Sequence, residues 1–200
     1  YTVSRIRVFS NAAVKFAWSE DMTESVKRYT YQSFGLNIES EVRLPELPII
    51  DDHTASADIK IIKNDLFGIG YELNGPSNKF LVRGGQVLFR LPGIATFCVR
   101  DGKEIVFSPA AGADERQIRL YLLGSCMGVL LMQRRILPLH GSALAMNGKA
   151  YAIVGQSGAG KSTLASALLD RGLRLLSDDV IAVTFDKTHT PMVSPSYPQQ

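Results

Sequence analysis

The chain has 200 residues, of which 46% are apolar and 20% are charged, an ordinary composition for a globular protein. A chain of this length buries about 70% of its unfolded surface, which excludes disorder and collagen-like repeats for most of it. The 22 basic and 19 acidic residues give a net charge of +3 and are interspersed along the chain. This balance indicates neither a nucleic-acid partner nor a membrane partner.

The cysteines and the apolar segments exclude further classes. Cys98 and Cys126 lie in apolar surroundings without a CxxC pair, which favours buried free thiols of a cytosolic protein over a disulfide or zinc framework. The longest apolar stretch, residues 120–132, is shorter than the roughly 20 residues of a membrane span. The first residues lack a signal-peptide pattern. We therefore expect a cytoplasmic protein.

Short strands and turns are predicted in the first half of the chain. A strand is expected at residues 5–9, a short helix at 21–31, and a loop over the acidic segment 39–48, whose two prolines exclude a helix. Asp101-Gly102 predicts a hairpin turn. Alternating apolar and polar residues predict strands at 57–63, 79–83, 86–91, 96–100 and 104–107.

The pattern changes near Pro109. A helix is predicted over 115–136, with acids in its first turn, Arg134 and Arg135 in its last turn, and Pro138 beyond it. Asn147-Gly148 predicts a hairpin between strands at 144–146 and 149–154. A glycine-rich loop, a helix over 162–171, a strand over 173–183 and a proline-bearing loop over 188–200 follow. These changes divide the chain into a strand-rich region, 1–110, and a second region, 111–200, that contains the glycine-rich loop.

Residues 155–162 match the phosphate-binding pattern G-x-x-x-x-G-K-[ST]. Glycines let backbone N–H groups curl around a phosphate, and the following helix directs its positive end at the same anion. An apolar strand before the motif and a helix after it favour nucleotide binding over the alternative, a structural turn with a solvated lysine. The predicted nucleotide-binding residues are Gly155, Gln156, Ser157, Gly158, Ala159, Gly160, Lys161, Ser162 and Thr163.

Asp178 and Asp179 end an apolar run, the pattern in which a carboxylate holds Mg²⁺ beside a nucleotide. Adjacent strand residues point to opposite faces, so both carboxylates face the nucleotide only if the strand bends or bulges there. The alternative is one core-facing or capping acid and one solvent acid. His140 lies before the hairpin and either relays a proton near these acids or is a structural histidine.

Five features stand together between about residues 139 and 183: His140-Gly141, Asn147-Gly148, residues 155–162, Arg171-Gly172 and Asp178-Asp179. Together they resemble the HPr kinase/phosphorylase family, whose nucleotide core is shared with phosphoenolpyruvate carboxykinase, and four of them keep the family's spacing. The segment 31–36 with 40–41 and 44–47 resembles HPr-kinase-like proteins of peptide-biosynthesis clusters, including lasso-peptide tailoring kinases that phosphorylate a C-terminal serine of a precursor.

The resemblance implies an α/β (α+β) fold with a P-loop kinase core preceded by a strand-rich region. It implies an ATP- and Mg²⁺-dependent serine kinase in which Asp178 is the general base, with Lys161 binding phosphate and His140 beside the base. Ser162 and Asp179 would hold Mg²⁺. Thr163 and Leu164 stand where the family usually has an acidic residue. The expected acceptor is a peptide or protein serine. A kinase of free serine, a nucleotide-binding module without transfer, and a homo-oligomeric state stay open.

Overall fold

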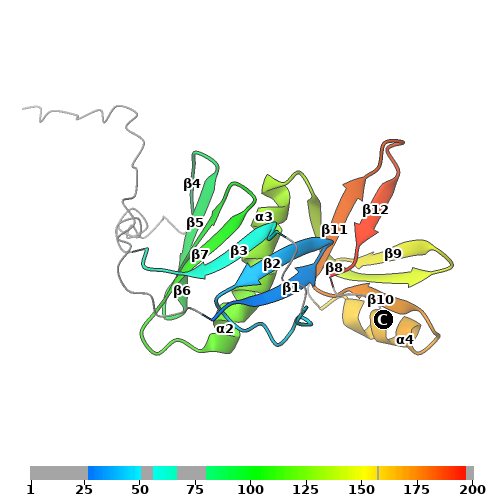
Figure 1. Cartoon of the computed structure of the whole chain (residues 1–200). Helices are drawn as coiled ribbons and strands as arrows, with labels where there is room; N and C mark the ends of the chain where they lie inside the picture. Colours follow the sequence, from blue (N-terminus) through cyan, green and yellow to red (C-terminus); the bar gives the residue numbers. More distant parts are fainter. Residues whose placement is uncertain (1–26, 51–55, 67–79, 157, 197–200) are drawn as a thin grey trace, which may run out of the picture.

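The computed structural model describes residues 27–50, 56–66, 80–156 and 158–196, and shows a mixed α+β fold with two sheets (Figure 1). The strand predicted at 5–9 lies outside the described residues. The helix predicted at 21–31 is wrong at its end, because residues 29–31 begin a strand. Among the described residues, no helix has the length and apolar character that crossing a bilayer requires.

Seven strands of the N-terminal half form one sheet in the order β1-β2-β3-β7-β6-β5-β4. β2 and β3 are parallel, as are β3 and β7, and the other neighbours are antiparallel. A two-residue turn with positive φ joins β1 to β2 at Phe34-Gly35. A three-residue turn, 101–103, joins β6 to β7, and its Asp101 and Gly102 have positive φ, as expected for the predicted hairpin turn. The strands are β1 Tyr29–Ser33, β2 Leu36–Ser40, β3 Ile59–Lys63, β4 Phe80–Arg83, β5 Gln86–Leu91, β6 Ala95–Arg100 and β7 Glu104–Pro109.

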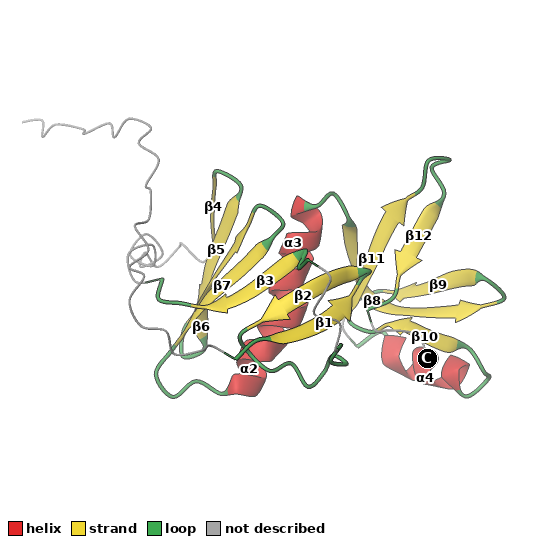
Figure 2. Ribbon diagram, in the orientation of Figure 1, coloured by secondary structure: helices red, strands yellow, loops and turns green. Residues whose placement is uncertain are grey.

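A helical segment covers one face of this sheet (Figure 2). It consists of α2 (Glu115–Tyr121), a π-helical turn η2 (Leu122–Cys126) and α3 (Met127–Gln133). Asp114 caps it by accepting a hydrogen bond from the N–H of Arg116, as its position before the acidic turn suggests. The prediction of one α-helix to residue 136 is wrong, since the middle turn is π-helical and α3 ends before both arginines. The helical side chains in the shared core are Ile118, Leu122, Cys126, Met127, Leu130 and Leu131.

The second sheet contains β8 (Leu137–Met146), β9 (Lys149–Val154), β10 (Arg174–Ser177), β11 (Val180–Phe185) and β12 (Pro191–Ser194). β9 pairs with one edge of β8 through the predicted Asn147-Gly148 hairpin. β10 and β11 pair end to end along the other edge, so the strand predicted over 173–183 is interrupted. β12 pairs with β11, which contradicts the loop predicted there. The remaining helix, α4 (Lys161–Leu169), packs against β8 and β9.

The two sheets meet along β11 and at the β1–β2 turn. Ala182 of β11 is buried in the first core, while its neighbours Ile181 and Val183 belong to a smaller core of the second sheet. At the turn, the Ser33 hydroxyl donates to the carbonyl oxygen of Ser196 at 2.7 Å. The N–H of Ser196 in turn donates to Leu176 of β10. Packing therefore continues across residue 110, and the predicted division into two regions stays a prediction.

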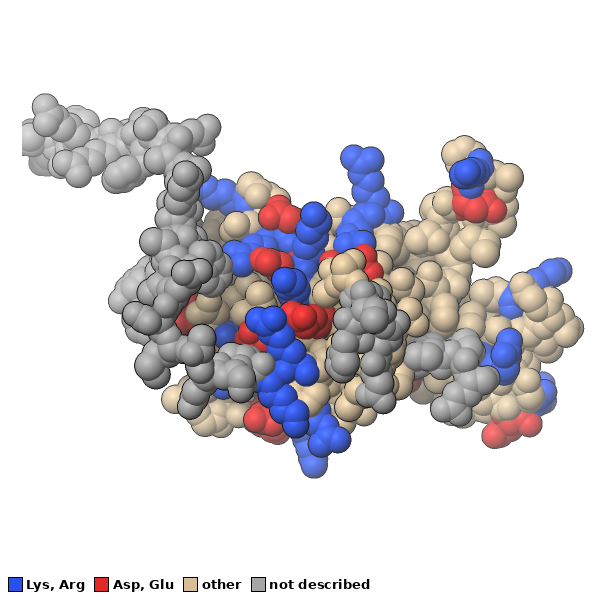
Figure 3. All heavy atoms as spheres, viewed as in Figure 1, with Lys and Arg blue, Asp and Glu red and all other residues tan. Residues whose placement is uncertain are grey.

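The exposed face of the first sheet carries mixed charges, which Figure 3 shows as interspersed basic and acidic side chains. Ion pairs join Arg28 to Glu39 and Arg100 to Glu104 across this face. These pairs place opposite charges next to one another on the described part of this face. In the interior, Cys98 and Cys126 are free and buried, as predicted, and burial raises the pKa of both thiols.

Candidate functional site

The glycine-rich loop joins β9 to α4. Gly158 and Gly160 both have a φ of 80°, a left-handed conformation that glycine adopts without steric cost. Gly160 is the N-cap of α4 and brings no side-chain cap, so the first N–H groups of the helix stay available to an anion. Ser162 and Thr163 are exposed in the first turn. Of the predicted nucleotide-binding residues, only Ser157 lies outside the described part of the chain.

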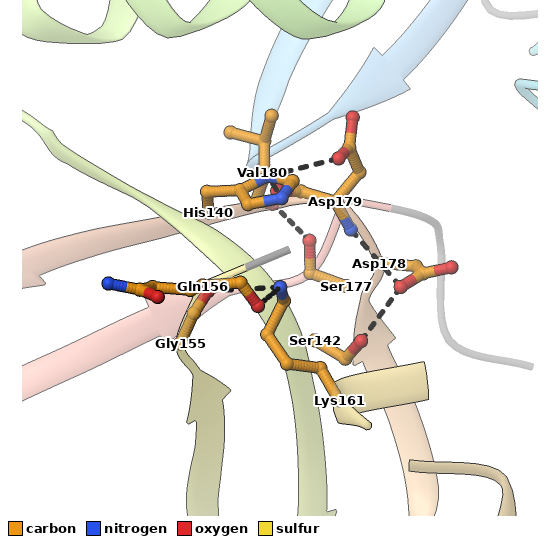
Figure 4. A network of polar contacts seen from close by, with 9 residues as sticks. All are labelled: His140, Ser142, Gly155, Gln156, Lys161, Ser177, Asp178, Asp179 and Val180. Carbon is orange, nitrogen blue, oxygen red and sulfur yellow. Dashed lines mark hydrogen bonds and ion pairs between the residues drawn. The ribbon is translucent and has the colours of Figure 1, made fainter. Parts of the chain in front are cut away.

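Lys161 turns back over this loop. Its Nζ donates to the carbonyl oxygens of Gly155 and Gln156, each at 2.9 Å. Figure 4 shows the lysine chain rising from the start of α4 toward these two carbonyls. The ammonium group therefore lies beside the loop backbone, where a bound phosphate would meet it.

Asp178 and Asp179 occupy the break between β10 and β11. The pairing with β8 shifts between Leu175 and Ser177, and Asp179 has a φ of 74°. A non-glycine residue in this region is uncommon, and such residues are found preferentially at functional sites. The strand therefore bends at the acid pair. Because of this bend, the side chains of Asp178 and Asp179 do not alternate between the two faces as regular strand residues do.

A single strand separates the acid pair from the glycine-rich loop. Gly141 of β8 pairs with Val154, the last residue of β9, and on its other edge donates its N–H to the carbonyl oxygen of Asp179 at 3.1 Å. Two strand spacings place the backbone of Asp179 roughly 10 Å from the start of the loop. A Cβ at Gly141 would lie 2.1 Å from the carbonyl oxygen of Ile153. This position therefore requires glycine.

Each acid has its own side-chain partner, as the dashed lines in Figure 4 show. The buried Ser142 hydroxyl donates to Oδ1 of Asp178 at 2.8 Å. The Nδ1 of His140 lies 3.1 Å from Oδ1 of Asp179. The histidine thus contacts Asp179, whereas the resemblance implies a place beside Asp178. The kink at Asp179 turns its carboxylate toward the histidine and so accounts for the difference.

Both acids border a cleft of about 390 Å³ that is also lined by residues of the N-terminal half and of the helical segment. This cleft, which we call the acid-pair cleft, is lined by the β1–β2 turn, the loop at residues 46–47 and the exposed side of α2 and η2. The Tyr31 hydroxyl accepts the N–H of Leu44 at 2.8 Å, and Arg119 pairs with Glu46 at 2.8 Å, which fixes the loop against α2. Burial raises the pKa of Tyr31, which keeps that hydroxyl neutral.

A second cavity of about 370 Å³ lies beside His140 and Asp179. Gly124 of the π-helical turn borders both cavities, and a Cβ there would lie 3.6 Å from Oδ2 of Asp179. Because π-helical turns occur frequently at functional sites, the interruption of the helix at this level is itself a functional signal. At Gly124 the helical segment thus presents its backbone, with no side chain, to Asp179.

The donor set fits magnesium. Asp178, Asp179 and Ser162 are exposed and carry only oxygen donors, the kind that Mg²⁺ prefers. Within the described residues, no group of three or more His, Cys, Asp and Glu side chains forms a metal site. Few protein ligands are expected for Mg²⁺ in a nucleotide site, since it is usually held by one or two carboxylates together with phosphates and water.

The sequence predictions missed Ser142, Gly124 and the cleft wall. Ser142 had a usable signal, because the Asn147-Gly148 hairpin fixes the register that places it beside the end of β9. The sequence contains no such signal for Gly124 or for the cleft wall, because both depend on packing between segments that are distant in sequence. Comparisons of the chain with family models, with curated proteins and with solved structures find no match.

Proposed function

We propose that the chain is an ATP-dependent serine kinase with an HPr kinase-like P-loop core. The observation that carries this proposal is the placement of the glycine-rich loop and the acid pair on either side of Gly141, with the acid-pair cleft bordering the acids. A kinase needs a phosphate site, a base and an acceptor site in this order, because the acceptor hydroxyl must approach the terminal phosphorus in line.

Lys161 and the loop bind the nucleotide phosphates in this proposal. The ammonium group now donates to two neutral carbonyls, and a phosphate offers it stronger, charge-assisted bonds. The uncapped N-terminus of α4 adds further donors and a favourable dipole. Mg²⁺, held by Ser162 and Asp179, would neutralise charge that develops on the phosphates.

Asp178 receives the proton of the acceptor hydroxyl. Ser142 donates to one of its carboxylate oxygens and fixes its orientation, while the aspartate itself is exposed. The hydroxyl oxygen forms a bond to the γ-phosphorus as the bond from that phosphorus to the bridging oxygen breaks, which releases ADP. Such a base contributes about 10²–10⁴-fold to the rate.

The acceptor is a serine hydroxyl of a peptide or protein. The acid-pair cleft, at about 390 Å³, is large enough for more than one amino acid, since clefts for small molecules begin near roughly 300 Å³. Its far wall is built by the β1–β2 turn and α2, and these elements have no part in nucleotide binding. Both points support a peptide over free serine.

Thermal denaturation with Mg²⁺ and ATP tests this proposal. At 100 times its dissociation constant ATP should stabilise the folded chain by about 2.7 kcal/mol, a rise in Tm of about 5–10 °C. Lys161→Ala should lose most of this rise, while Lys149→Ala, which removes an exposed lysine at the far end of β9, should keep it. Labelled ATP with serine peptides then reports transfer. The absence of any stabilisation by a nucleotide would contradict the proposal.

A further inference from the structure

The acid-pair cleft has a wall whose chemistry neither nucleotide binding nor proton transfer uses. Four of its apolar side chains come from outside the second sheet, and we call them the apolar wall: Phe34, Leu47, Leu120 and Leu123. They come from the β1–β2 turn, the following loop, α2 and η2. The same cleft holds Asp178 and Asp179, so the apolar wall and the acids face one space.

The residues of the apolar wall are held in place by specific contacts. Phe34 is buried at a φ of 56°, which is uncommon for an aromatic residue, and its N–H donates to the carbonyl oxygen of Pro195 at 2.9 Å. Leu47 is buried and donates its N–H to the carbonyl oxygen of Leu44 at 3.0 Å. Backbone hydrogen bonds thus fix these two residues of the wall.

Leu120 differs from the rest of the wall, because 62% of its surface is exposed. It borders both cavities beside Asp179. A single exposed leucine is ordinary on a protein surface. Leu120, however, borders a cleft next to two exposed carboxylates. An apolar group of a ligand that packs against Leu120 would remove apolar surface of both from water.

We infer that the acid-pair cleft binds the residue next to the phosphorylated serine, and that this residue is apolar; this inference rests on the proposed function. A hydroxyl within hydrogen-bond distance of Asp178 leaves the neighbouring residue inside the cleft. There an apolar side chain buries surface against the wall, whereas a charged one gives up water when it lies against these four side chains. Glu46, Arg116 and Gln117 also line the cleft, so the contact with the apolar wall, and not a lack of polar groups, is what favours an apolar residue. An acidic neighbour also meets repulsion from the two aspartates.

The test compares two short peptides that differ only beside the serine, where one has leucine and the other aspartate. The leucine peptide should have a kcat/KM at least about tenfold higher. Leu120→Glu should remove most of this preference, and it should fold because the side chain is exposed. Met132→Glu is the matched control: Met132 is 58% exposed on α3 and lies outside both cavities, so the preference should stay.

A binding measurement separates this inference from the proposed function. Calorimetry with analogues that carry alanine in place of the reacting serine should show the same preference for leucine and the same loss in Leu120→Glu. Equal binding of the two analogues, or an unchanged preference in Leu120→Glu, would overturn the inference even if a phosphopeptide forms. A preference in binding without any phosphopeptide would support the cleft's selectivity and overturn the kinase function instead.

Discussion

Replacement of Gly141 by alanine should destabilise the fold and disable the site together. The new Cβ would lie 2.1 Å from the carbonyl oxygen of Ile153 on β9. Since C···O contacts in proteins lie at about 3.3–3.6 Å, the two strands would have to separate by about 1 Å. Both contacting groups belong to paired strands and cannot rotate away, so the cost is expected near the upper end of overpacking, about 3 kcal/mol.

Thermal denaturation measures this cost as a fall in Tm of about 6–12 °C for a chain of this size. Gly128→Ala is the matched control, because nothing lies within 4 Å of a Cβ there and the residue is in α3. That change should be neutral or stabilising by up to about 1 kcal/mol. A Tm of Gly141→Ala within about 2 °C of the unaltered chain would refute the close approach of β8 and β9.

The same substitution should also affect the chemistry. Gly141 lies between the start of the glycine-rich loop and the acid pair, so a separation of about 1 Å moves one relative to the other. Displacements of this size cost about 10²-fold in rate when they misplace reacting groups. Turnover should therefore fall even at temperatures where the variant remains folded, and an unchanged turnover would refute the placement of the two groups.

The remaining predictions concern carboxylates. Asp178→Asn should keep nucleotide binding and lower turnover by about 10²-fold or more, because an amide cannot accept the proton; normal turnover of this variant would show that Asp178 is not the base. Asp179→Asn should raise the Mg²⁺ concentration needed for half-maximal activity. In the β11–β12 turn, hydrogen bonds from the Thr188 hydroxyl and from the N–H groups of Thr190 and Thr188 lower the pKa of Asp186 below its ordinary value of 3.8. Because the folded-state pKa is the lower one, the turn gains stability above the unfolded pKa and loses it as pH falls through the folded pKa. NMR titration of the Asp186 carboxyl should give a pKa below 3.8, and the turn in Asp186→Asn should not change over the same pH range.

The elements that the sequence predicts best are those with local signals. Asp101-Gly102 and Asn147-Gly148 favour tight turns with positive φ, and both hairpins are present. The β1–β2 hairpin lacks such a signal, because Phe34 is a poor turn residue. Its conformation is held by Pro195, which is distant in sequence. The helix predicted at 21–31 therefore extended over residues that form a strand.

The candidate site shows the same division between local and distant information. The glycine-rich loop and the kink at Asp179 follow from residue types and from the alternation of strand side chains. The partner of His140 depends on the pairing of β8 with β11. The π-helical turn beside Asp179 depends on how α2, η2 and α3 pack on the first sheet. Helix propensity alone does not distinguish a π-helical turn from an α-helical one, so the residue types at 122–126 do not predict the π-helical turn.

The bond from Ser33 to Ser196 has a consequence for how the chain folds. It closes a loop with a sequence separation of 163 residues, and contacts of such long range are slow to form because chain entropy is lost before they are gained. The β1–β2 turn cannot take its final position until the residues after β12 have left the ribosome. The acid-pair cleft is therefore one of the last parts of the protein to form, and a newly made chain completes this cleft only after residue 196 has left the ribosome.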